Sequence, residues 1–252
     1  NASIVMDQIG LFSNGLTSPV NIDSGVILST GNSLVAQIGP AAQVGGASQA
    51  STSPVVGDAD LATLVTGTIR NVAILEFDFV PSADTVKFNY VFASEEYLDF
   101  VNSSFNDVFA FLISGPGITG PYASPTGFPG GAINIAEVPG TVNWPVTIST
   151  VNDTLNSQYY NHDTLGQASA FNGYTDVFTA VAGVQACNVY HIKLAIADGT
   201  DDAYDSGVFL EAGSFDATEP GALNVNTVTS DVLCYGDTTG TAQLCIAGGV
   251  AP

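Results

Sequence analysis

The stretch VAILEFDFVPSADTVKFNYVF, residues 72–92, decides the fold that the sequence predicts. It holds two runs of β-branched and aromatic residues, separated by the turn-like PSAD at 81–84. From Leu75 to Phe79 every second residue is apolar and the residues between them are acidic, so one face of a strand is apolar and the other charged. We therefore expect two strands joined by a hairpin turn.

Further runs of this kind predict that the chain is built mainly from strands. In the run at 189–197, Ile192 and Leu194 face away from Lys193, which predicts a sheet with one buried face. Only the stretch 58–65 hints at a helix, with one of its aspartates as the N-cap. The remaining runs lie at 105–113, 175–182 and 207–215. Many short strands with turn residues between them predict an all-β, jelly-roll-like β-sandwich.

The composition excludes several classes of partner. The chain has 252 residues, 46% of them hydrophobic, which is enough for one large core. It carries 24 Asp and Glu against 3 Lys and Arg, a net charge of −21, so it repels nucleic acid and anionic lipid. No apolar run approaches the roughly 18 residues that span a bilayer, so we expect no direct membrane insertion. Metal cations and neutral sugars remain as partners.

Two acid-rich loops at expected strand ends predict a calcium site. They are SEEYLDFVNSSFND at 94–107 and DGTDDAYDSG at 198–207, and neither has the spacing of an EF-hand. Ca²⁺ takes about six to eight oxygen ligands, which loops of this composition supply. We expect the loops to meet and share at least one Ca²⁺. The predicted ligands are Glu95, Glu96, Asp107, Asp198, Asp202 and Asp205. The alternative is a solvated acidic loop whose carboxylates cap backbone N–H groups.

Several ordered blocks of the sequence resemble a known family. They are NIDSGVILSTGN (21–32), FNYVFASEEY (88–97), SSFNDVFAFLISGPG (103–117), YHIKLAIADG (190–199) and DSGVFLEAGSF (205–215). Over residues 9–216 the chain resembles the choice-of-anchor L domain of surface proteins from bacteria that use type 9 secretion. The tail, VLCYGDTTGTAQLCIAGGVAP at 232–252, resembles the opening of an SprB repeat, a sandwich unit of gliding-motility adhesins.

The resemblance implies a domain organisation and a function. Residues 1–218 would form the choice-of-anchor L-like sandwich, and residues 219–252 the first strands of a truncated, Ig-like SprB-type repeat. The chain would be an extracellular, non-enzymatic module of a large cell-surface adhesin or filament that mediates attachment and gliding motility. Its implied partners are surface glycans or another extracellular polymer, neighbouring repeats of the same polypeptide, and the type 9 secretion and motility machinery.

A carbohydrate-binding domain is the main alternative function. Aromatic side chains that stack on sugar rings are the usual lectin device, and four aromatic residues in polar stretches could supply such a platform. They are Trp144, Tyr159, Tyr160 and Tyr174. Packing in the core is the competing interpretation for each of them.

An aspartic-type protease is a further alternative. Asp23 and Asp205 each begin an Asp-Ser-Gly followed by apolar residues, as do the paired aspartates of two-lobed proteases. In both copies the Gly is followed by Val rather than by Ser or Thr, and the chain shows no comparable pair of lobes. We therefore expect no enzymatic activity.

Several residues are candidates for covalent modification. Thr154 and Thr164 follow Asp in polar loops and resemble the O-glycosylation signal of these secreted proteins. Cys234 and Cys245 flank a turn-like GDTTGT and form a possible disulfide, which leaves Cys187 as a buried thiol. Finally, strand lysines such as Lys87 and Lys193 permit an isopeptide bond to an Asn or Asp, with no motif that fixes the partner.

Overall fold

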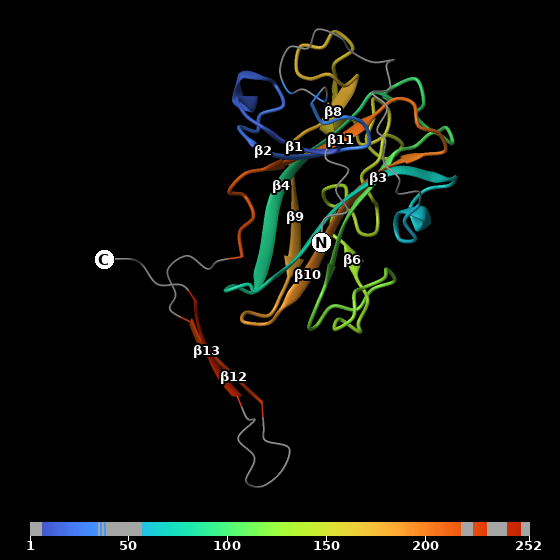
Figure 1. The fold of residues 1–252 in the computed structure, drawn as a ribbon. Coiled ribbons are helices and arrows are strands. Elements are labelled where there is room, and N and C mark those ends of the chain that lie inside the picture. Colours follow the sequence, from blue (N-terminus) through green and yellow to red (C-terminus); the bar gives the residue numbers. More distant parts are fainter. Residues whose placement is uncertain are drawn as a thin grey trace.

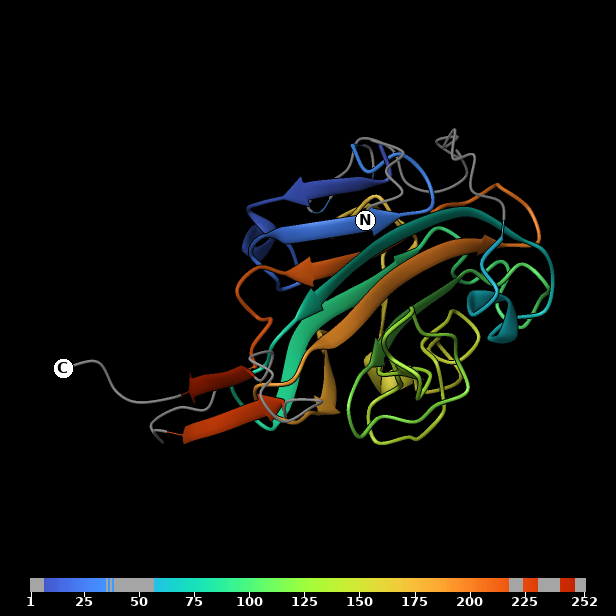
Figure 2. The same cartoon turned by 60° about the horizontal axis from the view of Figure 1, so that its bottom comes forward.

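The computed structural model describes residues 7–34, 36, 38, 57–217, 224–230 and 241–247, the last two segments as backbone apart from Thr241. The described chain is almost entirely β, and two sheets pack face to face as a sandwich (Figures 1 and 2). The predicted all-β sandwich is thus confirmed. Its three short 3₁₀ turns are η1 (Gly15–Thr17), η2 (Leu61–Thr63) and η3 (Ser157–Tyr159).

The larger sheet has seven strands and the smaller sheet has four. In spatial order the larger sheet runs β1 (Ile9–Phe12), β2 (Gly25–Ser29), β11 (Ser206–Glu211), β4 (Thr85–Ser94), β8 (Gly173–Thr175) and β7 (Tyr160–His162), with β9 (Phe178–Gly183) also paired to β4. The smaller sheet runs β3 (Ile69–Phe79), β10 (Tyr190–Gly199), β5 (Val108–Ser114) and β6 (Ile133–Asn134). All the paired strands are antiparallel.

An aromatic core fills the space between the two sheets. Tyr90 and Phe92 of β4 meet Phe109 and Phe111 of β5, and the Tyr90 and Phe111 rings cross edge-on at 4.9 Å. Ile192 of β10 lies in the same cluster, as the alternation at 189–197 predicts. Burial of such side chains is worth about 1.5–3 kcal/mol each, so this core is the main source of stability.

Parts of the outer faces of both sheets are also covered, whereas β9 keeps an exposed outer face. Loops pack over the larger sheet around Phe171 and Phe209, and η2 with the loop before β6 packs over the smaller sheet around Leu61 and Leu112. Strand β5 is consequently buried at every position. The prediction of sheets with one buried face is correct for β9, in which buried and exposed residues alternate. It is incomplete for β10, because small residues such as Ala195 occupy an outer face that is also covered.

The hairpin predicted at 81–84 is not present. The strands on either side of it, β3 and β4, belong to opposite sheets, with β3 paired to β10 and β4 paired to β11 and β9. PSAD is therefore the crossover between the sheets. The local turn signal is real, but the residues of a turn do not specify which strands will pair.

The stretch 58–65 forms only a single 3₁₀ turn, η2. The Asp58 carboxylate caps it, because Asp58 Oδ1 accepts hydrogen bonds from the backbone N–H groups of Asp60 and Leu61, both at 3.0 Å. The side chain of Leu61 is fully buried against the smaller sheet. These contacts fix the segment on the outer face of β10.

The C-terminal residues form a separate hairpin. Strands β12 (Asn224–Ser230) and β13 (Thr241–Ala247) pair with each other in a two-stranded sheet. The domain boundary predicted between 218 and 219 lies outside the described residues and stays a prediction. Within the described segments, no helix has the length and apolar character needed to cross a bilayer.

Candidate functional site

Five acidic residues come together at one end of the sandwich. Glu95 and Glu96 follow the end of β4, Asp107 precedes β5, Asp198 lies near the end of β10, and Asp205 precedes β11. In the larger sheet Ser94 is paired with Ser206, and in the smaller sheet Val108 is paired with Ala197, so these strand ends lie at one rim. We call these five residues the rim acids. The two loops predicted to meet do so.

Asp107 joins the two sheets at this rim. Its Oδ2 accepts a hydrogen bond from the Ser206 hydroxyl at 2.7 Å, and its Oδ1 accepts one from the Gly199 backbone N–H at 3.0 Å. The Asp107 N–H in turn donates to Glu96 Oε2 at 3.2 Å. Glu96, Asp107 and Asp198 are each about 1% exposed, so their carboxylates are removed from solvent.

A β-bulge positions the contact to Asp198. The register between β10 and β3 shifts between Ile196 and Asp198, and Asn71 of β3 adopts a left-handed backbone with φ 47° at this point. Its side-chain amide donates to Asp198 Oδ2 at 2.8 Å. The Asn71 carbonyl accepts a hydrogen bond from the Gln8 side chain at 2.8 Å, which holds the bulge in place.

Glu95 and Asp205 form the other half of the rim. The Asp205 N–H donates to Glu95 Oε2 at 3.2 Å, while the Glu95 N–H donates to the Asp205 carbonyl at 3.0 Å. The backbone of Gly31 lies against the Asp205 carboxylate, and a Cβ at position 31 would lie 2.0 Å from Asp205 Oδ2. A glycine is therefore required at this position for the carboxylate to fit.

Burial raises the pKa values of these acids. Burial, and then the negative charge of Asp205, raises the pKa of Glu95 from 4.5 to about 8. Burial is also the main cause that raises the pKa of Glu96 to about 8, with smaller contributions from Asp198 and Asp201 and an opposing hydrogen bond from Asp107. The pKa values of Asp107 and Asp198 are raised well above 3.8, first by burial and then by neighbouring carboxylates.

The two lysines of the described chain lie elsewhere, and Arg70, whose Cα is paired with that of Asp198, donates from Nε to the Thr200 carbonyl at 3.3 Å. Lys87 pairs with Asp216, and Lys193 pairs with Asp58 and Asp60. None of the ion pairs found in the described segments includes Glu95, Glu96, Asp107 or Asp198. At neutral pH these acids therefore depend on bound protons or on an added cation.

Buried oxygen atoms without hydrogen-bond partners occur in and beside the rim. They include Asp198 Oδ1 and, from neighbouring residues, Asn106 Oδ1 and Asp7 Oδ1. All three are acceptors, and carboxylate and amide oxygens are the ligand types that Ca²⁺ prefers. Among the described residues, however, no three His, Cys, Asp or Glu side chains are arranged around a common metal position. The donor chemistry fits calcium, and the side chains are not in a ligating arrangement.

Five of the six predicted ligands lie together at this rim, and their binding of calcium stays a prediction. The sixth predicted ligand, Asp202, is exposed on the outer part of the 198–207 loop. Asn71 and Asn106 were not predicted, because neither belongs to an acid-rich pattern and each enters the rim through backbone geometry. No sequence signal other than the strand-end position of Asn106 could have indicated them.

The protease arrangement does not form. Asp23 precedes β2 and Asp205 precedes β11, and these strands pair antiparallel with Gly25 opposite Glu211. The two aspartates therefore lie at opposite ends of the paired strands, and Asp23 is exposed. Two carboxylates that share a proton must lie in contact.

The four candidate aromatic residues do not make one platform. Tyr159 packs edge-on against Phe178 at 5.3 Å, and Tyr160 packs against Tyr97 at 4.8 Å. Tyr174 is 6% exposed, whereas Trp144 is 42% exposed. The Tyr174 side chain does line a polar cavity of about 410 Å³, together with Asn21, Asn161 and Asp176.

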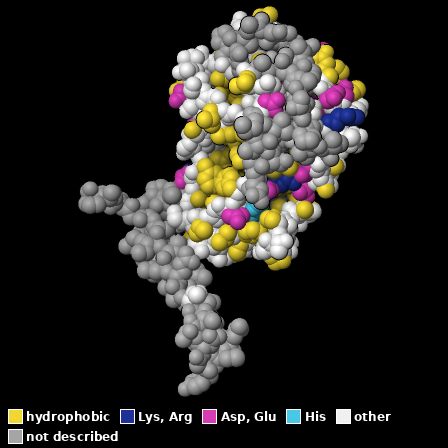
Figure 3. Space-filling model, viewed as in Figure 1, with side chains coloured by type: hydrophobic (Ala, Val, Ile, Leu, Met, Phe, Trp, Pro, Cys, Tyr) yellow, Lys and Arg dark blue, Asp and Glu magenta, His cyan; other side chains and the backbone are white. Residues whose placement is uncertain are grey.

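A larger cavity, of about 470 Å³, is lined mainly by apolar side chains of both sheets. Leu75 and Phe88 contribute from opposite sheets, and the partly exposed Phe77 and Phe215 flank the opening. Figure 3 shows one face of the molecule, on which hydrophobic side chains gather into patches and acidic side chains are scattered between them. Glu211 is the acidic residue that lines this cavity, and none of the rim acids contributes to it.

The candidate modification sites have different surroundings. Thr154 and Thr164 are both exposed, and the Thr164 hydroxyl lies 2.9 Å from His162 Nε2. Their glycosylation stays a prediction. The loop around Thr164 is organised by the buried Asp163, whose carboxylate accepts hydrogen bonds from the backbone at 167–169. Sequence reasoning did not identify this role.

Cys187 is disulfide-bonded, so the expectation of a leftover buried thiol is wrong. The side chains of Cys234 and Cys245 lie outside the described residues, as does the bridge predicted between them.

The fold and the site define an acidic, two-sheet β-sandwich domain with buried carboxylates at one rim. The family model of the choice-of-anchor L domain matches residues 1–216, and the chain belongs to this family. Family membership identifies the chain as a module of a cell-surface-associated protein, surface-anchored or secreted. No curated protein and no solved structure matches the chain.

Proposed function

We propose that this chain is a calcium-assisted, non-enzymatic module of a large extracellular adhesin or filament that mediates attachment and gliding motility. The observation that carries the calcium part is the burial of three neighbouring carboxylates, because Glu96, Asp107 and Asp198 are each only about 1% exposed at the same rim. Leaving a buried carboxylate oxygen without a donor or a cation costs about 1–3 kcal/mol or more. Family membership supports the surface location.

Glu96, Asp107 and Asp198 would hold the ion after their side chains turn toward a common position, which they do not share in this structure, with Asn106 as an additional amide ligand. When bound, Ca²⁺ would supply positive charge and no chemical step. The chain's own residues orient the carboxylates, since Gly199, Ser206 and Asn71 each donate to one of their oxygens. Extracellular modules bind calcium at about 0.1–1 mM. A millimolar concentration then contributes roughly 0.4–1.4 kcal/mol to stability.

Calorimetric titration tests the calcium proposal directly. We expect a binding heat with CaCl₂ and a rise in the melting temperature that EDTA reverses. Mg²⁺ is the matched control, because it demands a smaller, octahedral site and keeps its waters. Absence of both the heat and the thermal shift with Ca²⁺ would reject the site.

Attachment is tested separately from metal binding. Beads that carry the chain, and control beads that carry no protein, are passed under flow over a surface coated with an extracellular polysaccharide. In the presence of calcium, the proposal expects more of the chain-bearing beads than of the control beads to be retained. Equal retention of both kinds of bead would contradict the adhesin role even where calcium binds. The proposed docking of neighbouring repeats rests on the resemblance of the tail, and that of the type 9 secretion and motility machinery rests on the two resemblances together.

Carbohydrate binding is the second candidate function. The polar cavity beside Tyr174 supports it, because Asn161 donates to Asp176 Oδ1 at 2.8 Å and places an amide and a carboxylate next to an aromatic ring. Such groups recognise sugar hydroxyls. A glycan array with the chain and an Asp176→Ala variant tests this function. Binding that the variant loses supports the cavity as a sugar site, and binding of no glycan contradicts it.

A further inference from the structure

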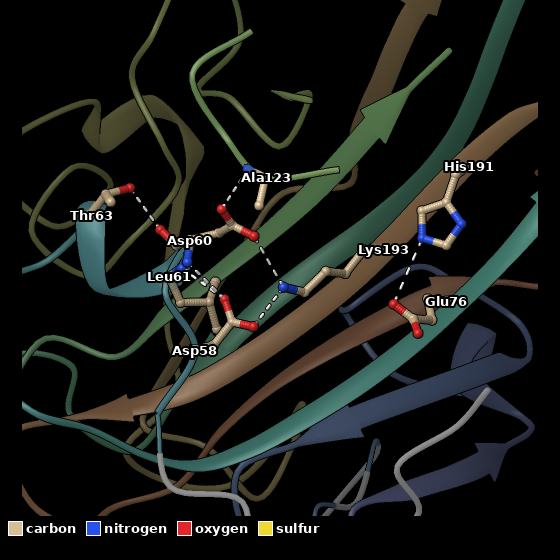
Figure 4. Close-up of polar contacts among 8 residues, drawn as sticks. All are labelled: Asp58, Asp60, Leu61, Thr63, Glu76, Ala123, His191 and Lys193. Carbon is tan, nitrogen blue, oxygen red and sulfur yellow. Dashed lines mark hydrogen bonds and ion pairs between the residues drawn. The ribbon is translucent and has the colours of Figure 1, made fainter. Parts of the chain in front are cut away.

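A second cluster of charged side chains lies on the outer face of the smaller sheet, away from the rim acids. Lys193 projects from β10 between two aspartates of the segment that leads into η2 (Figure 4). Its Nζ lies 2.5 Å from Asp58 Oδ2 and 3.2 Å from Asp60 Oδ2. Ordinary ion pairs of this kind lie on the surface, whereas this one is largely buried.

Burial removes most of this cluster from solvent. The side chains of Lys193, Asp58 and Asp60 are 17%, 10% and 11% exposed. They border the apolar cluster of the outer face, in which Leu61 and Leu112 are almost fully buried. Amide formation joins an amine to a carboxyl group, and this cluster holds the two within hydrogen-bond distance and largely away from bulk water.

The Asp58 carboxyl group is held as an acyl-transfer substrate would be. Its Oδ1 accepts two backbone N–H bonds, from Asp60 and Leu61, both at 3.0 Å. Two such donors form an oxyanion hole, which stabilises negative charge on that oxygen when a nucleophile attacks the carbon. The other oxygen, Oδ2, faces the Lys193 amine.

Asp60 is placed to transfer protons. The backbone N–H of Ala123 fixes Asp60 Oδ1 at 2.8 Å, so that Oδ2 is directed toward the Lys193 amine. A carboxylate in this position accepts a proton from the attacking nitrogen and delivers it to the departing oxygen. A cavity of about 190 Å³ adjoins Lys193 and Asp60 and gives the leaving molecule room.

We propose that Lys193 and Asp58 form an intramolecular amide bond, with Asp60 as the proton-transfer group. The Nζ–Cγ bond forms and the Cγ–Oδ2 bond of Asp58 breaks. The ammonium loses two protons, which leave with Oδ2 as one water, so the reaction consumes no oxidant or cofactor. Close placement of the reacting groups replaces the activation that amide formation otherwise needs. The bond would covalently join the η2 segment to the central strand β10.

Intact mass under denaturing conditions tests the bond. The purified chain is expected to be lighter than its sequence mass by one water, and proteolysis is expected to release a linked pair of peptides containing Asp58 and Lys193. The full sequence mass with no linked pair would overturn the proposal and leave only an ion pair. The cross-link does not depend on calcium, so its failure would leave the proposed function untouched.

Four variants separate the bond from the ion pair. Lys193→Arg keeps the positive charge but cannot form the amide, so its full sequence mass is expected. Asp58→Asn keeps the shape of the acyl group, and its mass loss is expected to be one ammonia instead of one water. Asp60→Asn is expected to slow or abolish the loss of water from the intact mass. A mass loss as large as that of the wild type would contradict the proton-transfer role of Asp60. Lys87→Arg is the matched control, because Lys87 is 55% exposed and pairs with Asp216 at 3.6 Å, and the wild-type mass loss should persist.

Discussion

At the scale of single residues, the rim acids oppose one another in the absence of a cation. The charge of Asp107 contributes to the raised pKa of Asp198, and that of Asp198 contributes to the raised pKa of Glu96. Removing one of these charges relieves the repulsion. The residues that create the site are therefore expected to destabilise the metal-free fold.

Asp198→Asn tests this balance. In EDTA at pH 8 we expect the variant to be more stable than the wild type by about 1–3 kcal/mol, because a neutral amide replaces a buried charge. The same variant should lose the stabilisation by calcium. Urea unfolding with and without CaCl₂ measures both effects. Asp99→Asn, at an exposed position, is the control and should change neither. A variant less stable than the wild type in EDTA would contradict the prediction.

The raised pKa values of Glu95 and Glu96 predict a pH dependence for the metal-free chain. Between about pH 4.5 and about pH 8 the folded chain holds protons on these carboxyls that the unfolded chain has released. The free energy of unfolding consequently falls as the pH rises through this window. Thermal melting in EDTA at a series of pH values checks the sign. Melting temperatures that increase steadily from pH 5 to pH 8 would show that these acids are already ionised in the folded chain.

Part of this rim can be predicted from the sequence, and the rest cannot. Five acids could be predicted because acids that follow or precede buried strands gather where the strand ends meet. Asn71 could not, since its contact to Asp198 depends on a bulge and a positive φ that no pattern of residue types records. Gly31 also escaped prediction, because its role is the close approach of its backbone to Asp205.

At the scale of elements, the end of β10 fits tightly against the start of β5. A Cβ at Gly199 would lie 2.5 Å from the backbone oxygen of Asn106. Gly199→Ala is therefore expected to lower the free energy of unfolding by about 1–3 kcal/mol, since backbone must shift to accommodate the methyl group. Gly183→Ala, where a Cβ meets nothing within 4 Å, is the matched control and should stay within about 0.5 kcal/mol. Chemical denaturation compares the two, and equal stabilities would contradict the close fit.

The positions of the strands were easier to predict than the pairing between them. The alternation along β10 gave its inner face correctly, because period-two burial is a property of each strand alone. The hairpin at 81–84 failed because pairing is decided by the whole fold, and consecutive strands here join different sheets. The single 3₁₀ turn at 61–63 replaces a longer helix, because the Asp58 cap and the burial of Leu61 satisfy the segment within one turn.

At the scale of the whole molecule, both sheets and all the rim acids lie before residue 218. Ala217 completes the sandwich, since its carbonyl accepts hydrogen bonds from the backbone N–H groups of Ser82 and Ala83. A chain ending at residue 218 is therefore expected to fold and to keep its response to calcium.

Thermal melting of the short and full chains checks this boundary. Both are compared under reducing conditions, because the full chain has a disulfide at Cys187 and the short chain lacks the other two cysteines. Melting temperatures within a few degrees of each other support the boundary. A short chain without a cooperative transition would show that the tail belongs to the sandwich.

The partial covering of both outer sheet faces restricts how this module meets other molecules. A sandwich with bare faces can offer a broad, flat surface, but here loops occupy part of those areas and build small cores of their own beneath them. The surfaces left for recognition are the loop tips, the strand edges, the ends of the sandwich and the exposed face of β9. Replacing a loop would thus alter the surface offered to a partner and leave the aromatic core between the sheets unchanged. Related modules can therefore differ in the partners they bind while they keep the same fold.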